Sequence, residues 1–490
     1  MLANALPQLY ALVLSVVAAR YLGPSGMGRQ SFIAFVEATT ITLLSGSFSL
    51  ALMRYIGEAV GAGRAGSARW LAVRILWIEM AAALVGGGAL VVIAALGGEP
   101  RDAWVLAALA VVSSTVATVP GAVLVGLQRW RDATIAGLTT GGLGVVATIV
   151  VLSLGGRITA MFVVEAIVTT IALLWTGALA RGALDGLHAQ PTPAPDLLRG
   201  TVRFAVFSFG GSILYLIVWR RSEFFFLQHY SSDRQIAFYS IAFAVATGVV
   251  RLPSAMGEVL APAVATLFGA GAHERIRAGF SRALRLLVLA TLPVTAAAAA
   301  LGPEALRLFW GEAFSPATGP FLIMVAASLL TPVTVLCSSL LAGLGRVGVP
   351  LLAEALAAGV DIGVAFALVP HHGALGAAIA SSCALVASGL PLLVYASRIT
   401  GPLGVQPVAL VRGAMIAGAG GGVAWAVSAA FGGGVGLVLG LLCGTAVFLG
   451  LALLVGFLPR ADAEWLREVL GKRFSGPAGD ALLALAGRRQ

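Results

Sequence analysis

Two adjacent arginines and a nearby carboxylate interrupt an otherwise apolar stretch, in the order Arg220, Arg221, Ser222 and Glu223. A guanidinium group stays charged at physiological pH and donates paired hydrogen bonds to phosphate or carboxylate oxygens. A charge at the centre of a membrane helix costs at least about 2.5–3.5 kcal/mol, so such groups usually face a protein interior or a wet cavity. We therefore predict that Arg220, Arg221 and Glu223 face a cavity and bind a ligand there, with the arginines binding its anionic group.

Arg251 belongs to the same predicted binding group because its expected depth is similar. Counting inward from Ser231 at 1.5 Å per residue places Arg220 about 16 Å deep, near the middle of a core about 30 Å thick. Arg251 is about as deep in the next apolar run. The alternative is self-neutralisation, since Arg220 and Glu223 are spaced i,i+3 and can pair with each other. Spacing alone leaves both interpretations open.

Three carboxyl residues inside other apolar runs are candidates for ion coupling or for a gate: Glu37, Glu165 and Asp361. Intramembrane acids commonly bind or relay protons or Na⁺, and they also pair with arginines. Both roles stay open for these three. Glu79, by contrast, is expected near the cytoplasmic end of its helix, in contact with water.

The elements that must position these residues are membrane helices. The chain of 490 residues is 59% hydrophobic and only 11% charged, whereas soluble domains carry about 25% charged residues. Apolar runs of about 20 residues are long enough to cross a bilayer. We predict an all-α polytopic membrane protein with fourteen spans, near 2–19, 28–53, 71–96, 104–125, 134–154, 158–180, 203–228, 236–260, 283–302, 318–342, 350–369, 374–396, 408–430 and 435–457.

The charge distribution predicts the orientation. The net charge is +10, and most basic residues fall in loops that are cytoplasmic if the N-terminus is inside. Basic cytoplasmic loops follow the positive-inside rule, so we expect both termini in the cytoplasm and no nucleic-acid partner. Arg20 and Arg29 are exceptions, because they flank the first outer loop. The three cysteines lie in apolar runs, and we expect no metal site, disulfide or catalytic residue.

The chain repeats itself at two related offsets, which predicts two matching six-helix lobes around a central cavity. A shift of 208 residues aligns Gly61, Gly63, Arg69 and Arg74 with Gly269, Gly271, Arg277 and Arg282, and a shift of 217 aligns Gly126, Leu127 and Arg129 with Gly343, Leu344 and Arg346. The predicted domains are an N-lobe at 1–180 (helices 1–6), a cytoplasmic linker at 181–203, a C-lobe at 203–396 (helices 7–12), helices 13–14 at 397–458 and a cytoplasmic tail at 459–490.

Several segments, in this order, resemble a known family. ARYLGPSGMG and MRYIGEAVGAG are similar to the first helical hairpin of polysaccharide-unit flippases, and RSEFFFL and SRALRLLVLATLPVTA are similar to their later helices. GLGRVGVP and VPHHGALGAAIAS resemble the tenth to twelfth helices. The resemblance covers about residues 10–396 and points to the polysaccharide transporter family of the multidrug/oligosaccharidyl-lipid/polysaccharide (MOP) flippase superfamily.

The resemblance implies a flippase that carries a lipid-linked (polyprenyl-pyrophosphate) oligosaccharide or polysaccharide repeat unit from the inner to the outer leaflet by alternating access. It implies a location in the bacterial cytoplasmic membrane and contact with membrane lipids. Polysaccharide polymerase and glycosyltransferases of the same pathway are the expected protein partners. Arg220, Arg221 and Arg251 would then bind the pyrophosphate. Some members carry Asn where this chain has Asp361, a departure that bears on any ion site there.

Other functions within and outside the superfamily remain as alternatives. A peptidoglycan-precursor lipid flippase or a multidrug/cation antiporter would share the fold. A membrane-embedded polymerase or glycosyltransferase is disfavoured, because no outer loop is long and no catalytic constellation is evident. We expect no enzyme activity and no cofactor, with transport driven by H⁺, Na⁺ or the membrane potential.

Overall fold

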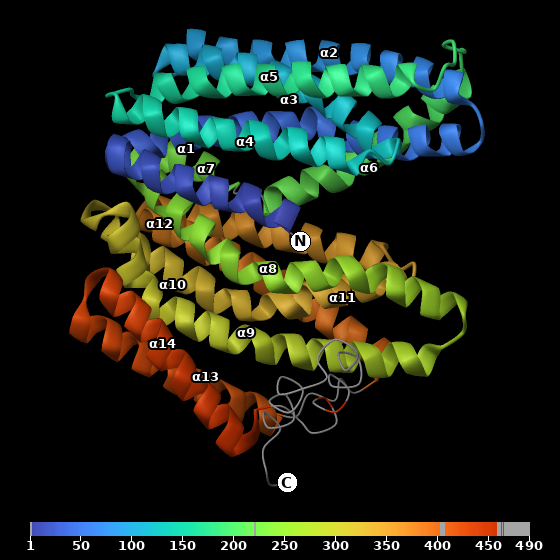
Figure 1. Ribbon diagram of the computed structural model, residues 1–490. Helices are drawn as coiled ribbons and strands as arrows, with labels where there is room; N and C mark the ends of the chain where they lie inside the picture. Colours follow the sequence, from blue (N-terminus) through green and yellow to red (C-terminus); the bar gives the residue numbers. More distant parts are fainter. Residues whose placement is uncertain (1, 220–221, 402–406, 458–461, 463, 465–490) are drawn as a thin grey trace. The chain divides into compact units, whose positions relative to one another are not determined.

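The computed structural model describes residues 2–219, 222–401, 407–457, 462 and 464, and within these it describes the backbone alone at some helical positions (Figure 1). All α-helices and shorter turns of helix in this part of the chain follow one another with short connections. They are α1 (Leu2–Gly61), α2 (Ala65–Ala95), α3 (Arg101–Gly126), α4 (Trp130–Ser153), α5 (Ile158–Asp185), α6 (Pro195–Trp219), α7 (Glu223–Tyr230), α8 (Asp233–Gly269), α9 (His273–Trp310), η1 (Glu312–Ala317), α10 (Thr318–Ala327), η2 (Ser328–Leu330), α11 (Thr331–Gly343), α12 (Gly348–Thr400), α13 (Pro407–Phe431), α14 (Gly433–Leu451) and η3 (Ala452–Gly456).

The predicted fold class is confirmed. Within the described residues, ten helical segments are long and apolar enough to cross a membrane. Two of these, α1 and α12, each cover two predicted spans, because a glycine bends the helix: Gly23 has φ 66° and Gly373 has φ 53°. Glycine alone adopts such left-handed backbone angles at little cost. The predicted spans at 203–228 and 236–260 correspond to α6, α7 and α8, around residues that the structure does not describe.

The chain forms two compact units. The N-terminal unit comprises Met1–Gln228 and Ser232–Ala237, and the C-terminal unit comprises His229–Ser231 and Phe238–Gln490. By packing, α6 belongs to the N-terminal unit, where Phe204 meets Tyr55 of α1 edge to face at 6.5 Å. The predicted domain limits describe the two halves of the sequence repeat and not these compact units, so they remain predictions. The predicted linker is largely helical, because α5 continues to Asp185 and α6 begins at Pro195, a residue suited to the first turn of a helix.

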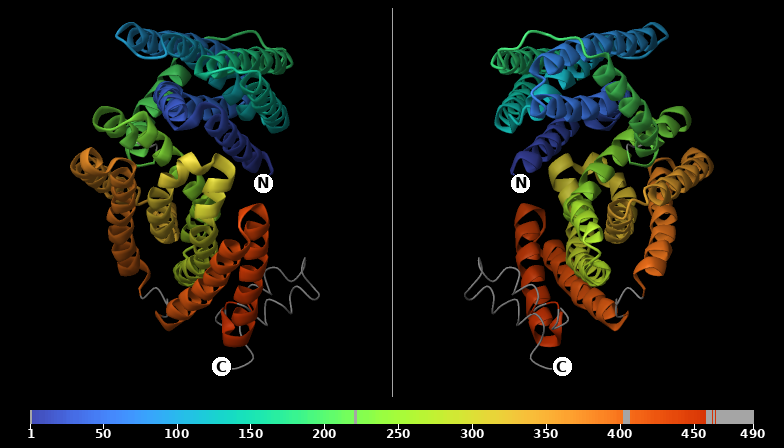
Figure 2. Two further views of the ribbon diagram at one scale, coloured as in Figure 1. Left: turned by 90° about the vertical axis from the view of Figure 1, so that its left-hand side faces the viewer. Right: turned by 90° about the vertical axis from the view of Figure 1, so that its right-hand side faces the viewer.

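Each unit has a continuous apolar core between its helices. In the N-terminal unit, Leu52 of α1, Leu71 of α2 and Val123 of α3 belong to one buried cluster. In the C-terminal unit, the corresponding cluster includes Leu284 of α9 and Leu336 of α11. The α13–α14 pair, side by side in both views of Figure 2, joins a further cluster on α9.

The predicted repeat recurs as local geometry inside each unit. A Cβ on Gly126 would lie 2.9 Å from the Met53 carbonyl oxygen, and a Cβ on Gly343 would lie 2.7 Å from that of Ala261. Met53 and Ala261 are related by the shift of 208, as Gly126 and Gly343 are by 217. Both units therefore pack the same two helices backbone to backbone at a position where only glycine fits.

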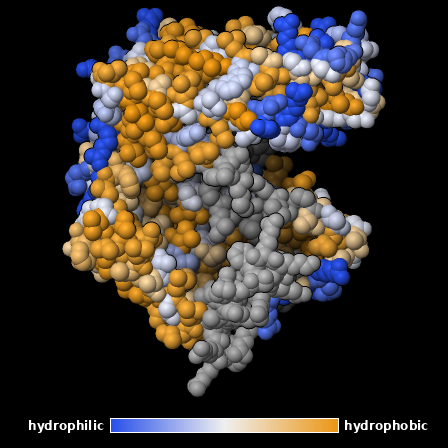
Figure 3. All heavy atoms as spheres, viewed as in Figure 1, coloured by the Kyte–Doolittle hydropathy of each residue, from blue (hydrophilic) through white to orange (hydrophobic). Residues whose placement is uncertain are grey.

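The outer faces of the helices are apolar. Trp77, Val85 and Leu174 expose 65%, 72% and 67% of their surface, and hydrophobic residues cover wide areas of the face seen in Figure 3. Soluble monomers rarely expose such large continuous apolar areas. The surface is therefore one that faces lipid.

Candidate functional site

The predicted anion-binding arginines fall largely outside the described part of the chain. Arg220 and Arg221 are not described, and Arg251 is described only as backbone within α8 (Asp233–Gly269). Glu223 is described: it begins α7 and is 2% exposed. The binding role of this cluster therefore stays a prediction.

Aromatic contacts hold α7 against α1. Phe224 stacks on Phe35 with ring centroids 4.9 Å apart, and Phe225 meets the same ring edge to face at 5.1 Å. Phe224 is fully buried, so this contact fixes the start of α7, including Glu223, on the part of α1 that carries Glu37. Glu37 itself projects from nearly the opposite side of α1, since two residues turn a helix by about 200°.

Glu37 and Glu165 come together inside the N-terminal unit. Ile33 of α1 and Phe162 of α5 are fully buried in one apolar cluster, and Glu37 and Glu165 follow them by about one helical turn. The two carboxyl groups interact electrostatically. Glu37 is 5% exposed, and its Oε2 accepts no hydrogen bond from any residue that the structure describes. The structure thus joins two of the three predicted ion-coupling candidates.

The chemistry of the Glu37–Glu165 pair suits the binding of a proton or a cation. Two ionised carboxylates in a poorly hydrated site repel each other, and the repulsion is relieved when one carries a proton or when a cation lies between them. Carboxyl oxygens are also the usual ligands of hard cations. The arrangement can therefore take up a single positive charge.

Asp361 lies in the other unit. It is 1% exposed in α12, on a buried stripe that includes Ala357 and Ala365. Because Asp361 belongs to a different unit from Glu37 and Glu165, its role remains a separate prediction.

The expectation that Glu79 is in contact with water is wrong. Its side chain is 0% exposed. The helix α2 starts at Ala65 and ends at Ala95, so Glu79 lies at its middle rather than at its cytoplasmic end. The error arose because the apolar run begins later than the helix does.

Arg29, a basic residue on the predicted outer side, forms an ion pair. Arg29 of α1 lies 3.0 Å from the carboxylate of Asp233 at the start of α8. A Cβ on the neighbouring Gly28 would overlap the Asp233 carbonyl oxygen, so glycine is required for this close approach. The start of α8 therefore packs closely against the glycine-rich segment at the bend of α1. The sequence alone did not indicate this contact.

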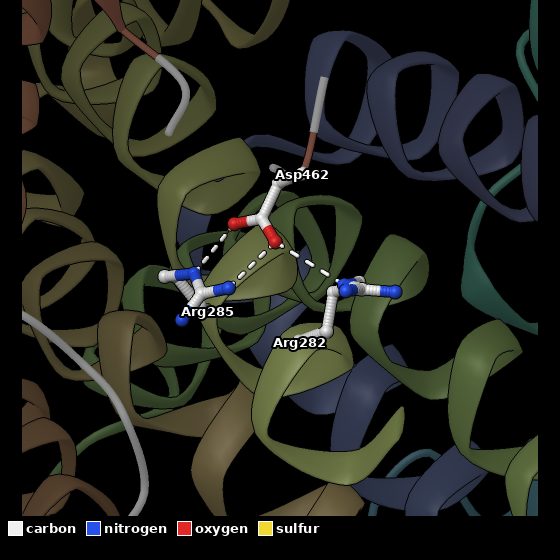
Figure 4. Close-up of polar contacts among 3 residues, drawn as sticks. All are labelled: Arg282, Arg285 and Asp462. Carbon is white, nitrogen blue, oxygen red and sulfur yellow. Dashed lines mark hydrogen bonds and ion pairs between the residues drawn. The ribbon is translucent and has the colours of Figure 1, made fainter. Parts of the chain in front are cut away.

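A second cluster missed from the sequence lies in the C-terminal unit (Figure 4). Asp462 is fully buried and accepts two hydrogen bonds of 2.5 Å from Arg285, from Nε and from Nη2. Arg282 approaches the same carboxylate at 3.3 Å. The i,i+3 spacing of these arginines on α9 was the available signal, but Asp462 was assigned to the tail. We call these three residues the Asp462 clamp.

Comparison with known proteins adds a family and a fold. A family model described as polysaccharide biosynthesis protein matches residues 73–318, half of the chain. The comparison with curated proteins found no match.

Solved structures of transporters are similar over most of their length. The lipid II flippase MurJ in an inward closed conformation has a TM-score of 0.71 at 11% identity, covering 96% of this chain and 99% of that one. An inward-facing multidrug resistance MATE family transporter of the MOP superfamily has a TM-score of 0.65 at 17% identity, covering 80% and 95%. A MOP superfamily transporter from Pyrococcus furiosus has a TM-score of 0.56 at 15% identity, covering 82% and 93%. At these identities the similarity shows a shared fold. The chain belongs to the polysaccharide biosynthesis protein family, and it is a multi-pass membrane protein whose fold is shared with transporters of the MOP superfamily.

Proposed function

We propose that the protein is a flippase that moves a lipid-linked oligosaccharide or polysaccharide repeat unit, attached through pyrophosphate to a polyprenyl chain, from the inner to the outer leaflet. The observation that carries the proposal is the combination of a polysaccharide biosynthesis family match with a transporter fold. Transport takes place in the bacterial cytoplasmic membrane, with both termini in the cytoplasm.

The cargo's chemistry agrees with the basic residues of the chain. A pyrophosphate cannot cross hydrocarbon without partners that replace water. Arg220, Arg221 and Arg251 supply charged, paired hydrogen-bond donors in the middle of their predicted spans. In this proposal they bind the pyrophosphate while the sugars occupy the rest of the central cavity.

The Glu37–Glu165 pair supplies the coupling site in this proposal. A proton or Na⁺ bound there during one half of the cycle would link the cargo's movement to an ion gradient. Because the carboxyl groups interact, they act as one unit, and coupled residues give non-additive effects. Glu37→Gln and Glu165→Gln are each expected to reduce gradient-driven flux strongly, and the double variant is expected to do little further harm. Two independent, additive losses of flux would contradict a shared site.

Flipping by purified protein in vesicles tests the cargo. The vesicles carry a fluorescent polyprenyl-pyrophosphate oligosaccharide, and its outward movement is measured with an imposed pH, Na⁺ or voltage gradient. Arg221→Ala and Arg251→Ala are expected to reduce flipping at least tenfold, since one hydrogen bond to a charged group is worth about 1.5–3 kcal/mol. Arg131→Ala, which removes an exposed arginine in the first turn of α4, is the matched control and should flip normally.

Lipid II is the second cargo for the same assay, because the structurally similar MurJ is a lipid II flippase. Faster flipping of lipid II than of the oligosaccharide lipid would replace the proposed cargo with a peptidoglycan precursor. Extrusion of a cationic drug with no flipping of either lipid would assign the protein to drug transport instead.

A further inference from the structure

An arginine on the lipid-facing side of α2 has no counter-ion in the described part of the chain. Arg74 is exposed, and its guanidinium group lies over the Trp70 ring, 5.5 Å from the ring centroid. It makes no ion pair and no hydrogen bond with any residue that the structure describes. The proposed transport cycle does not use this residue, so its charge is available to another ligand.

The exposed side of α2 beyond Arg74 is apolar. The helix lies at an edge of the N-terminal unit (Figure 1) and packs mainly on α1 and α3, which leaves its opposite side uncovered. From Arg74 to the end of α2, all exposed side chains are apolar, and the large ones include Trp77, Leu84, Val85 and Val92. This side of the helix therefore contacts the acyl chains of lipids.

The length of the apolar side places Arg74 at the level of the lipid headgroups. Arg74 and Ala95, the last residue of α2, are about 32 Å apart along the helix at 1.5 Å per residue. The hydrocarbon core of a bilayer is about 30 Å thick. When the apolar side spans this core, Arg74 lies at its inner boundary in the proposed orientation, where the phosphate groups of the lipids begin.

Two tryptophans flank Arg74 on the same side of the helix. Trp70 precedes it by about one turn and Trp77 follows it by about one turn, with 65% of Trp77 exposed. Neither indole N–H donates a hydrogen bond to any residue in the described ranges. Tryptophan is enriched where a membrane protein meets the headgroup region. The three side chains thus present one charged and two neutral hydrogen-bond donors to that region.

The other half of the repeat shows what the equivalent arginine binds. The shift of 208 relates Arg74 to Arg282 of α9, and Arg282 lies 3.3 Å from the carboxylate of Asp462. The chain itself therefore supplies an oxyanion at this position in the C-terminal unit. No described residue supplies one to Arg74 in the N-terminal unit.

The same difference extends along the helix into the apolar region. A Cβ on Gly413 of α13 would contact Leu289 and Leu292 of α9. The equivalent residues of α2 are Ala81 and Leu84, and both are exposed. The helix face that α13 covers in the C-terminal unit is therefore uncovered in the N-terminal unit, where acyl chains take its place.

The charge of the surface indicates which class of lipid fits. Trp77 is equivalent to Arg285, so the surface of α2 has one cation where the Asp462 clamp has two. A single guanidinium group matches the single negative charge of a phosphodiester. A zwitterionic phospholipid also carries an ammonium group, which Arg74 repels. A phospholipid with a net negative headgroup has no such opposing charge.

We propose that Arg74, with Trp70 and Trp77, binds the headgroup phosphate of an anionic phospholipid in the inner leaflet. The guanidinium group donates charge-assisted hydrogen bonds to the phosphate oxygens, and the indole N–H groups donate to phosphate or ester oxygens. The acyl chains lie along the exposed apolar side of α2. The lipid thereby occupies the position that α13 and Asp462 occupy in the other half of the repeat.

Lipid binding by the purified protein in detergent tests the site without any cargo, so its result is independent of the proposed flippase activity. Phosphatidylglycerol and phosphatidylcholine with identical acyl chains are titrated, and bound lipid is counted by native mass spectrometry. We expect the wild type to bind phosphatidylglycerol more tightly. Arg74→Gln should weaken its tightest binding about fivefold, the effect of one basic residue at an anionic membrane surface.

Arg131→Gln is the matched control, because Arg131 is exposed in the first turn of α4. It should bind phosphatidylglycerol as the wild type does. Trp77→Leu keeps the charge and removes one indole donor, so it should weaken binding less than Arg74→Gln. Melting temperatures without lipid check that the variants are folded, and Arg74→Lys, which retains the charge, should keep the preference for phosphatidylglycerol.

Three results would overturn the proposal. Equal affinity of the wild type and Arg74→Gln for phosphatidylglycerol would leave the exposed face of α2 to a membrane protein that takes the place of α13. Equal losses in Arg74→Gln and Arg131→Gln would show a general attraction of anionic lipid to a basic protein. A wild type that binds both lipids equally would show that the surface does not recognise headgroup charge.

Discussion

The helices α2 and α9 are equivalent in the repeat, yet their arginines have different surroundings. Arg74 of α2 is exposed and lies over the Trp70 ring, 5.5 Å from its centroid. Its equivalent, Arg282 of α9, lies 3.3 Å from the buried Asp462 carboxylate. One turn further along, the exposed Trp77 of α2 corresponds to Arg285 of α9, which binds Asp462 through two hydrogen bonds.

The difference shows which feature belongs to the repeat and which was added to one copy. Both halves of the repeat have the close glycine contact described above, made by Gly126 in one half and by Gly343 in the other. That contact therefore belongs to the structure of each lobe. The Asp462 clamp occurs on the helix that also receives α13, where Gly413 packs against Leu289 and Gly421 against Ala296. We interpret the clamp as the fastening of the additional C-terminal helices to the second lobe.

The largest expected effect is that of Asp462→Ala. The substitution leaves two arginines beside a buried site without their counter-ion, and breaking a buried ion pair by removing one partner typically costs about 3–5 kcal/mol. Thermal unfolding in detergent should show a clear loss of stability. Asp185→Ala is the control, because Asp185 pairs with Arg69 at 2.7 Å but is 49% exposed, and exposed pairs contribute about 0–1 kcal/mol. Equal melting temperatures for the two variants would show that the Asp462 clamp does not stabilise the attachment of the C-terminal helices.

The two arginines of the clamp should differ in effect. Arg285→Met removes two hydrogen bonds of 2.5 Å, and we expect a loss of about 1.5–3 kcal/mol per charged hydrogen bond, reduced where water replaces it. Arg282→Met removes one longer contact and should cost less. Unfolding of the two variants side by side measures the order, and a larger effect for Arg282 would contradict the geometry of the clamp.

We expect the smallest loss of stability for a substitution of Arg74, the residue of α2 that is equivalent to Arg282. Arg74→Met removes an exposed cation–π contact, which is worth about 0.5–1 kcal/mol. Because Arg74 and Arg282 are equivalent in the repeat, the pair of Met variants isolates what Asp462 contributes. A loss of stability for Arg74→Met as large as that for Arg282→Met would mean that both arginines serve the repeat and not the added helices.

The helices of this fold are predictable from the sequence because each must satisfy its own backbone in lipid. Long apolar runs with glycine and charged breaks therefore predicted the spans. The repeat was equally visible, since the glycines at 126 and 343 are each required by a close backbone contact. What the apolar runs did not predict is where a helix begins outside the membrane, and this is why Glu79 was assigned to a helix end.

Contacts between distant parts of the chain were less predictable. Glu37 and Glu165 were each selected as intramembrane acids, but only the packing of Ile33 and Phe162 in one cluster brings them together. Asp462 follows the last apolar run, where charge patterning alone suggests an exposed tail. Its burial depends on two arginines 177 residues or more before it, a partnership without a local signature.

That long separation has a consequence for how the protein is made. Arg282 and Arg285 are synthesised and inserted well before Asp462 exists. At about 5–20 residues per second, the ribosome needs roughly 9–35 s to add the 177 residues between Arg285 and Asp462. During that interval the Asp462 carboxylate is not yet available to the two arginines. Asp462 thus makes the final stability of α9 depend on a residue that is translated much later, so that a chain arrested before residue 462 would lack this buried ion cluster.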